Sequence, residues 1–356
     1  MKYLNISSRL RTASLLVLLL TMVCTEFGLA QSKVGTTAAP FLTIGTGARA
    51  TALGHAYTAT ATGADALFWN VSGAAIPQDG IGTTGSAMFT NHQLFVGIDY
   101  NAFALTLPIS GTGVLGLSGA IVDYGTMDVT TAQFEDGTGE IFSAQDLVVG
   151  LSYAQPLTST FYIGGQAKYI SQRIWDMRAN TIAVDIGLTL ITDYLNGMKL
   201  AASIQNFGGQ LQLEGINVRE TYDPDEDILG NNDRVFIRRE TDSFNIPISF
   251  RFGVAIPLIK ETNYDLQVFG ESHQTNDQNL NGDFGSEFTY KTNSTKFFIR
   301  GGYRDAFINR NDIVQRWSYG AGLEVTYSQL RFGFDFAVAE NDFLQDTRMI
   351  DFRIYF

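Results

Sequence analysis

The chain has 356 residues, of which 36 are Asp or Glu and 24 are Lys or Arg, giving a formal net charge of −12. This acidic balance argues against nucleic-acid binding, so we expect no nucleic acid among its partners. A single cysteine leaves no basis for a disulfide framework or a cysteine-based metal site. Abundant Phe, Tyr and Gly combined with a mean hydropathy near zero are typical of a transmembrane barrel, whose strand residues face lipid and a polar lumen alternately.

The N-terminus has the pattern of a secretory signal peptide. An apolar run over 13–23 is followed by small residues at 28–30, and three basic residues precede it: Lys2, Arg9 and Arg11. The apolar run is too short to span a bilayer as a permanent helix. We therefore expect 1–30 to be a cleaved signal peptide. A lipid anchor on Cys24 is the alternative, but Val23 is the wrong residue to precede it.

Residues 41–75 differ from everything that follows. They are built mainly from Gly, Ala and Thr, and they lack the alternation of a strand. Small residues allow backbone segments to pack closely in a confined space. We therefore predict that residues 31–80 form a compact plug which the later strands surround.

Beyond residue 80, apolar and polar residues alternate with the period of β-strands. Phe332, Phe334 and Phe336, for example, alternate with polar or small residues. Strands of about ten residues or more suit a tilted crossing of a membrane. We count about fourteen of them: 82–90, 93–107, 113–124, 145–156, 160–173, 178–192, 197–207, 244–257, 263–274, 284–291, 295–304, 315–327, 330–340 and 347–356.

The connections between these segments sort by length. Short turns such as 108–112 and 292–294 alternate with mostly longer loops such as 125–144 and 208–243, although the connection at Asn91-His92 is tight. This is the pattern of outer-membrane barrels, with short periplasmic turns and longer outer loops. Pairing of the last strand with the first would remove open edges from hydrocarbon. The predicted fold class is all-β: a closed antiparallel transmembrane barrel over 81–356, in the outer membrane, with the lipid bilayer as partner.

The plug also carries a family resemblance. Gly45-x-Gly47-Ala48-Arg49-Ala50, Leu53-Gly54-x-Ala56-Tyr57 and Asp65-Ala66-Leu67-Phe68-Trp69-Asn70 together resemble the opening of the PorV/PorQ family of type IX secretion proteins, which are related in fold to FadL-type barrels. Where that family usually has Pro-Ala-Gly after the Asn, this chain has Val71-Ser72-Gly73. The motif residues carried over by this resemblance are Gly45, Gly47, Arg49, Gly54, Asp65, Trp69 and Asn70.

The resemblance implies a non-enzymatic role. PorV-like members receive cargo with a C-terminal signal domain from the type IX translocon and pass it to the surface attachment machinery, and PorQ-like members act in the attachment complex. These proteins are the partners that the resemblance implies. The alternative is a FadL-like transporter of hydrophobic small molecules. A continuous apolar pocket between plug and wall would favour transport, whereas an exposed apolar patch on the outer rim would favour cargo binding.

The sequence gives little support for catalysis or cofactor binding. Of His55, His92 and His273, the last has Ser272 beside it, but neighbouring strand residues face opposite sides and cannot act together. We expect no catalytic residues, no enzyme activity and no cofactor. No zinc site can be assembled from this spacing.

One loop resembles the front half of a calcium loop. It contains four alternating oxygen donors: Asp277, Asn279, Asn281 and Asp283. Phe288 stands where a closing Glu is expected. A hydrated loop explains the same residues and is the interpretation that we favour.

The loop 208–243 holds an acidic cluster followed by basic residues: Asp223, Asp225, Glu226, Asp227, Arg234, Arg238 and Arg239. It is either a solvated rim or a partner-binding or lid segment, because long loops in compact folds tend to be functional. Charges of both signs also face the predicted lumen. Charges at membrane depth must pair or meet water, so we expect them to bond the plug, whose own charges are Arg49 and Asp65.

Overall fold

The structure of the chain is a computed structural model that describes residues 35–78, 85–109, 111–224, 235–307, 315–342 and 344–356. The expected signal peptide, 1–30, lies outside these residues. Within the described ranges, no helix has the length and hydrophobicity of a membrane span.

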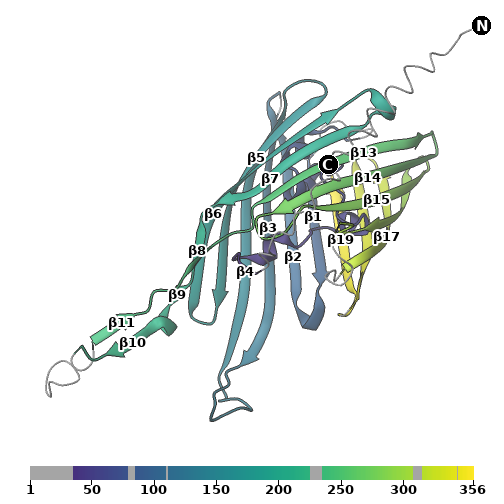
Figure 1. Cartoon of the computed structure of the whole chain (residues 1–356). Helices are drawn as coiled ribbons and strands as arrows, with labels where there is room; N and C mark the ends of the chain where they lie inside the picture. Colours follow the sequence, from purple (N-terminus) through teal and green to yellow (C-terminus); the bar gives the residue numbers. More distant parts are fainter. Residues whose placement is uncertain (1–34, 79–84, 110, 225–234, 308–314, 343) are drawn as a thin grey trace, which may run out of the picture. The chain divides into compact units, whose positions relative to one another are not determined.

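Fourteen strands form a closed antiparallel barrel, as the sequence predicts (Figure 1). Each strand pairs with the next along the chain, with β7 followed in the wall by β13, and β19 pairs with β1 to close the ring. The wall strands are β1 Ser86–Gln93, β2 Asp99–Ile109, β3 Gly113–Asp128, β4 Ile141–Pro156, β5 Phe161–Ile174, β6 Met177–Ile191, β7 Lys199–Gly208, β13 Ser249–Lys260, β14 Tyr264–Thr275, β15 Asn281–Lys291, β16 Thr295–Tyr303, β17 Gln315–Tyr327, β18 Leu330–Asn341 and β19 Thr347–Tyr355.

The barrel has its apolar face outside and its polar face inside, the reverse of a soluble protein. On β6, Ile182 and Ile186 are 66% and 50% exposed, whereas the intervening Asp185 is 1% exposed. The same alternation runs along β18, where the Phe side chains point outward. A soluble sandwich would bury the apolar set, so this arrangement fits a wall surrounded by lipid.

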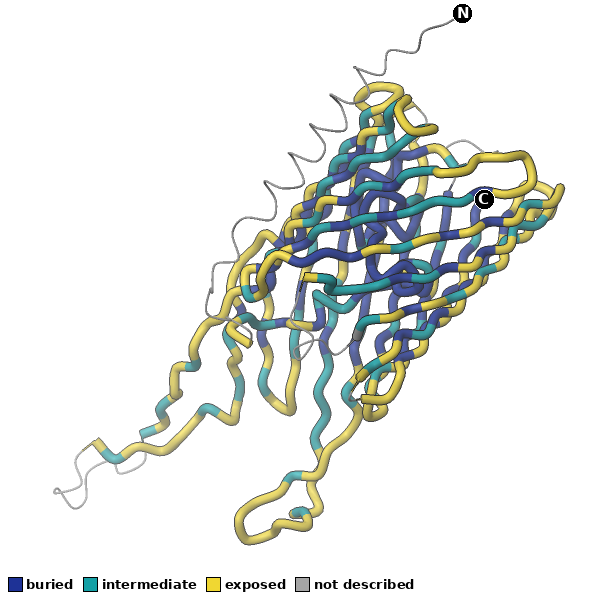
Figure 2. The backbone as a smooth tube through the Cα atoms, turned by 45° about the vertical axis from the view of Figure 1, so that its right-hand side comes forward, coloured by how far each residue is buried: buried dark blue, intermediate teal, exposed yellow. Residues whose placement is uncertain are grey.

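The N-terminal segment fills the barrel with short helices, which Figure 2 shows as buried chain inside the ring of strands. Ala, Gly and Thr dominate this segment, and Gly and Thr have lower helix propensity than Ala. The elements are η1 Pro40–Thr43, α2 Ala48–Ala52, η2 Gly63–Asp65, α3 Ala66–Trp69 and η3 Val71–Ala75.

The long insertion between β7 and β13 is an ordered extension rather than a plain loop. β8 Gln210–Gln212 pairs with β12 Ser243–Asn245, and β10 Arg219–Tyr222 pairs with β11 Val235–Arg238. β9 Glu214–Gly215 joins the outer end of β6, and η6 Ile216–Val218 leads into β10. Paired strands are favoured here because alternation continues on both sides of the acidic cluster.

Two connections differ from the sequence-based expectation. The prediction of a tight turn at Asn91-His92 was wrong. β1 continues to Gln93, and η4 Phe95–Gly97 makes the turn, with positive φ at Val96 and Gly97. The hairpin of β3 and β4 also extends beyond its predicted ends, with a register irregularity between Asp123 and Thr126. Local turn geometry moves strand ends without changing which strands pair. On the opposite rim, η5 Tyr194–Asn196 forms the turn between β6 and β7.

The alternation of loop lengths generates a test of orientation. Asn279 and Asp193 are both exposed, at opposite ends of the barrel. We expect Asn279→Cys to react with a membrane-impermeant maleimide on whole cells and Asp193→Cys to react only after the outer membrane is permeabilised. Labelling of Asp193→Cys alone on intact cells would mean that the barrel is inserted the other way round.

Candidate functional site

The plug and the wall approach each other at backbone distance. Gly54 has φ +64, and a Cβ on it would lie 2.7 Å from the backbone nitrogen of Tyr303 on β16. From the wall side, a Cβ on Gly302 would lie 2.0 Å from the Gly54 nitrogen. Only glycine on both sides permits this contact. The small-residue composition of the segment therefore serves close packing inside the lumen.

The aromatic end of the plug motif is anchored by hydrogen bonds. Trp69 donates its indole N–H to the carbonyl of Thr46 at 2.7 Å, and the Arg251 guanidinium lies 4.9 Å from the Trp69 ring centroid. Asn70 donates its amide to the carbonyls of Thr58 and Leu188, at 3.2 and 3.1 Å. One acceptor is in the plug and the other is in the wall, so Asn70 joins the two.

The turn after Asn70 has no proline at the position where the resembled family usually has one. The segment continues as η3, and the Ser72 hydroxyl donates to Asn70 Oδ1 at 2.8 Å. A side-chain hydrogen bond between neighbours in a turn can take the place of a proline that fixes φ.

The first part of the motif folds around His55. A Cβ on Gly45 would lie 2.6 Å from the His55 ring, and Gly47 adopts φ +102. The His55 ring also meets the edge of Trp69, with centroids 5.5 Å apart. Burial lowers the pKa of His55 well below its usual value. His55 is therefore a neutral packing residue of the plug.

A chain of alternating charges ties the plug to the wall. Arg49 donates to Glu287 at 2.9 Å, and Glu287 accepts from Arg300 at 2.5 Å. Arg300 pairs with Asp335, Asp335 with Arg353, and Arg353 with Asp65 at 3.1 Å. The chain thus begins and ends on plug residues, passes through four wall strands between them (β15, β16, β18 and β19), and balances three cations with three anions. The expectation that lumen charges bond the plug's Arg49 and Asp65 agrees with these contacts.

Further wall charges pair with each other. Arg251 meets Glu271 at 2.8 Å, and the second carboxylate oxygen of Glu271 accepts the backbone N–H of both Tyr57 and Thr58 at 2.9 Å. Lys168 meets Asp185 at 2.6 Å. These pairs satisfy buried charge at membrane depth.

The described residues leave a small hollow between plug and wall, of about 140 Å³. Charged and polar side chains line most of it, among them Arg49, Gln78, Asp265, Glu287, Lys291, Glu324 and Arg331. A lining of this kind suits water or ions and opposes an apolar guest. It is not the continuous apolar pocket that a hydrophobic solute needs.

The calcium candidates Asn281 and Asp283 share Asp305 as a partner, whereas Asp277 has other partners. Asp277 accepts from Thr37 and Thr275, whereas the amide of Asn281 donates to Asp305. Asn279 is exposed, and Asp283 is fully buried. Calcium binding by this loop stays a prediction.

One group of potential metal ligands was missed from the sequence. His273, Asp283 and Asp305 each offer one atom, and these atoms lie within 4.8 Å of one another. The His273 ring lies between the carboxylates, 3.1 Å from Asp283 and 3.6 Å from Asp305. The register of β14 and β15 brings two of these residues together, because it places Asp283 diagonally across from His273.

Some of the partner-binding candidates in the loop 208–243 lie in the part of the chain that the structure describes, and others lie outside it. Arg238 meets Glu214 at 3.4 Å, and Arg239 meets Glu220 at 2.9 Å. Asp223 is half-buried beyond the end of β10. Asp225, Glu226, Asp227 and Arg234 lie outside the described residues. The extension exposes Tyr222, which is 52% exposed, and Phe236, which is 80% exposed. The tip of the β3–β4 hairpin exposes Phe134, which is 59% exposed.

No family model and no curated protein matches this chain. Solved structures do match. The toluene transporter TodX of Pseudomonas putida has a TM-score of 0.52 at 10% identity, covering 87% of this chain and 97% of that chain. A Pseudomonas aeruginosa FadL homologue has a TM-score of 0.51 at 10% identity, covering 87% and 98%. The fold is that of a FadL-like outer-membrane barrel.

At this identity the likeness establishes the fold and not the activity. A TodX mutant described as a monoaromatic hydrocarbon channel matches equally well, with a TM-score of 0.53 at 11% identity over 87% of this chain and 98% of that chain. TodX is named as a toluene transporter and its mutant as a monoaromatic hydrocarbon channel. They give no support to PorV/PorQ membership, which stays a prediction.

The charge chain of this FadL-like barrel predicts a stability effect. In Glu287→Gln, the buried Arg49 and Arg300 guanidiniums lose the carboxylate between them. We expect the free energy of unfolding to fall by about 3–5 kcal/mol, measured by denaturant titration in lipid vesicles. Glu340→Gln, at an exposed position on β18, should change it by less than about 0.5 kcal/mol. Equal effects in both variants would show that the chain does not hold the fold.

The position of the plug in the lumen leads to a second prediction, on ion conduction. Deletion of 45–69 removes Arg49 and Asp65 together, so the wall residues of the charge chain stay balanced. Because the hydrogen bonds of the wall run between strands, we expect the deleted protein to fold and to conduct ions in planar bilayers. If it is as ion-tight as the full chain, the segment does not close the lumen.

Proposed function

We propose that this chain is an outer-membrane barrel of the PorV/PorQ kind, whose outer rim binds secreted cargo of the type IX pathway. The observation that carries the proposal is the contrast between its interior and its rim. The plug packs against the wall at backbone distance, and the hollow beside it is charged. Two extensions, the β3–β4 tip and the β10–β11 hairpin (Figure 1), in contrast expose the aromatic side chains of Phe134, Tyr222 and Phe236.

The exposed apolar side chains support partner binding because they lie beyond the wall strands. Phe134 is in the β3–β4 tip, and Tyr222 and Phe236 are in the β10–β11 hairpin. Aromatic side chains of this kind are enriched where proteins meet, since they bury a large area at low entropic cost. Charges of both signs beside them would affect the association rate and its salt dependence more than the final affinity.

The motif resemblance supports the identity of the partner. The residues that carry it, including Arg49, Asp65, Trp69 and Asn70, all make specific contacts in the plug. The plug is thus the fixed core of the molecule. Cargo with a C-terminal signal domain, the translocon and the attachment-complex proteins are the partners that follow from the resemblance.

Transport of hydrophobic solutes is the second candidate, and the fold likeness to TodX and the FadL homologue favours it. In this candidate the plug must rearrange to open a lateral path through the wall. Such a movement would break the plug ends of the charge chain, at Arg49 and Asp65.

The rim proposal predicts a loss of binding on removal of two aromatic side chains. In Tyr222→Ser combined with Phe134→Ser, we expect an isolated cargo signal domain to bind the detergent-solubilised chain about tenfold or more weakly, because a buried interface aromatic contributes roughly 2 kcal/mol. Biolayer interferometry measures the dissociation constant. The matched control is Tyr194→Ser, which removes a side chain that is 78% exposed in the turn of η5.

The same preparation separates the two candidate functions. If the wild-type chain binds no signal domain but speeds toluene entry into vesicles, the chain is a transporter. If the rim variant and the control bind the signal domain equally well, the cargo site is not on these two extensions.

A further inference from the structure

The outer ends of β5 and β6 carry an ordered gradient from apolar to cationic side chains. Three successive same-face pairs of the register are Tyr169 with Ile182, Ser171 with Asn180, and Arg173 with Arg178. Tyr169 also donates to Asn180 at 2.9 Å, which links the first step to the second. At about 3.3 Å per residue, the gradient from Ile182 to Arg178 takes roughly 13 Å. This distance is comparable to the polar interface that adjoins a hydrocarbon layer.

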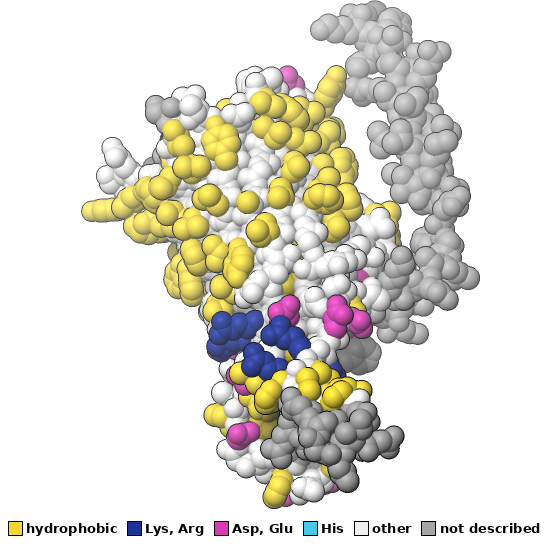
Figure 3. Space-filling model, turned by 90° about the vertical axis from the view of Figure 1, so that its left-hand side faces the viewer, with side chains coloured by type: hydrophobic (Ala, Val, Ile, Leu, Met, Phe, Trp, Pro, Cys, Tyr) yellow, Lys and Arg dark blue, Asp and Glu magenta, His cyan; other side chains and the backbone are white. Residues whose placement is uncertain are grey.

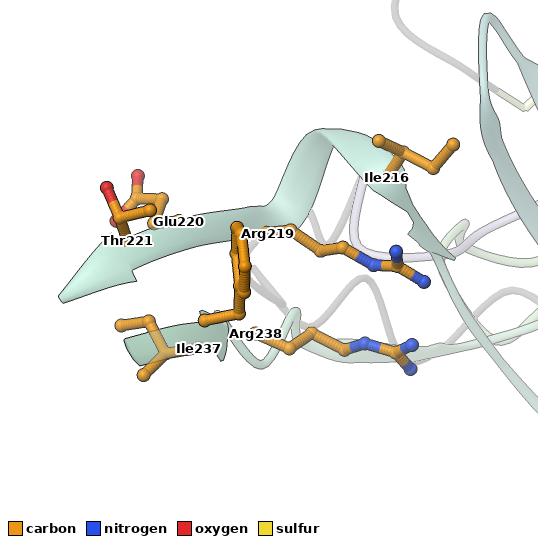
Figure 4. A pocket seen from close by; sticks show the side chains of 7 residues that line it. Ile216, Arg219, Glu220, Thr221, Ile237 and Arg238 are labelled. Atoms are coloured by element: carbon orange, nitrogen blue, oxygen red, sulfur yellow. The ribbon is translucent and has the colours of Figure 1, made fainter. Parts of the chain in front are cut away.

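A second arginine pair stands close to the first. Arg219 and Arg238 are directly opposite each other in β10 and β11, and in Figure 4 their guanidinium groups point in the same direction. Like charges directly opposite on paired strands destabilise the pair. The chain has this unfavourable arrangement twice, at Arg173–Arg178 and at Arg219–Arg238.

Four arginines line two adjoining surface hollows, which together we call the arginine groove: Arg173, Arg178, Arg219 and Arg238. Arg178, Arg219 and Arg238 line a single hollow of about 640 Å³, and Arg173 lines the adjoining one together with Arg178. Asp176 and Glu214 line it as well, so cations outnumber anions by four to two.

Protein carboxylates neutralise the groove only in part. Glu214 reaches Arg238 at 3.4 Å, with both side chains more than half exposed, and such a pair is weak. Arg173 donates to the hydroxyl of Ser143. Among the described parts of the chain, Arg178 and Arg219 form no ion pair. In a protein of net charge −12, such a cluster of arginines indicates an anionic ligand from outside the chain.

We propose that the arginine groove binds the phosphate groups of a phosphorylated lipid headgroup in the outer leaflet. Guanidinium groups bind phosphate through paired, charge-assisted hydrogen bonds. A doubly phosphorylated headgroup would place a phosphate against each arginine pair and remove both like-charge repulsions. Asn180, which lines both hollows, adds an amide donor between the pairs.

The position of the groove favours a lipid over a soluble anion. Leu147 and Tyr169 line the hollow of Arg173 and Arg178, so the cations directly adjoin side chains of the lipid-facing wall. Figure 3 shows Lys and Arg side chains gathered at the edge of the hydrophobic surface. A lipid bound there would keep its acyl chains against the wall while its phosphates meet the arginines.

Native mass spectrometry of the full chain in neutral detergent tests the proposal, with doubly phosphorylated lipid A as the probe. We expect wild-type protein to retain the lipid and to bind its dephosphorylated form about tenfold or more weakly. Arg178→Gln combined with Arg219→Gln should weaken retention about tenfold, equivalent to about 1.4 kcal/mol. Arg178→Lys combined with Arg219→Lys should retain more lipid than the Gln variant, because the charge remains while the paired geometry is lost.

The matched control is Arg348→Gln combined with Lys260→Gln, which removes two exposed charges outside the groove. It should retain lipid as wild type does, and heat-modified migration on gels should show that all variants are folded. Equal retention by the Gln variant and wild type would overturn the proposal, as would equal binding of the dephosphorylated lipid. Displacement of the lipid by an equal concentration of inorganic phosphate would assign the groove to free phosphate instead.

Discussion

The structure depends on the buried chain of charges that runs from Arg49 through Glu287, Arg300, Asp335 and Arg353 to Asp65. Each charge inside a membrane barrel is expensive unless it is paired. Here every member is paired, and the two ends belong to the plug. The wall strands therefore carry lumen charges that pair with the plug at both ends of the charge chain.

This constraint explains the distribution of small and aromatic residues. Inside, glycine and alanine bring the plug backbone against the wall, as at Gly54 and Gly302. Outside, Phe and Ile side chains face lipid. Exposed aromatic residues beyond the wall include Phe134 on the β3–β4 tip and Tyr222 and Phe236 on the β10–β11 hairpin. The rim is therefore where the geometry leaves room for a protein partner.

Strand number and pairing order followed from the sequence because alternation with period two is directly visible in strands such as β6 and β18. The partners inside the lumen did not follow, because a pairing such as Arg49 with Glu287 joins residues 238 positions apart and depends on how the plug is seated. The group of His273, Asp283 and Asp305 was missed for a similar reason: its geometry depends on strand register and on one loop residue. Neither is encoded by local spacing.

The charge chain also constrains the transporter candidate. A hydrocarbon can gain at most about 1.5 kcal/mol per non-hydrogen atom on binding, and it has no charge with which to replace a broken ion pair. If the plug were displaced, Glu287 would lose its ion pair with Arg49, and Arg353 would lose its ion pair with Asp65. A ligand shifts an equilibrium only by its differential affinity for the two states. The apolar contacts of the solute would therefore have to offset the loss of two ion pairs, whereas binding at the rim leaves both intact.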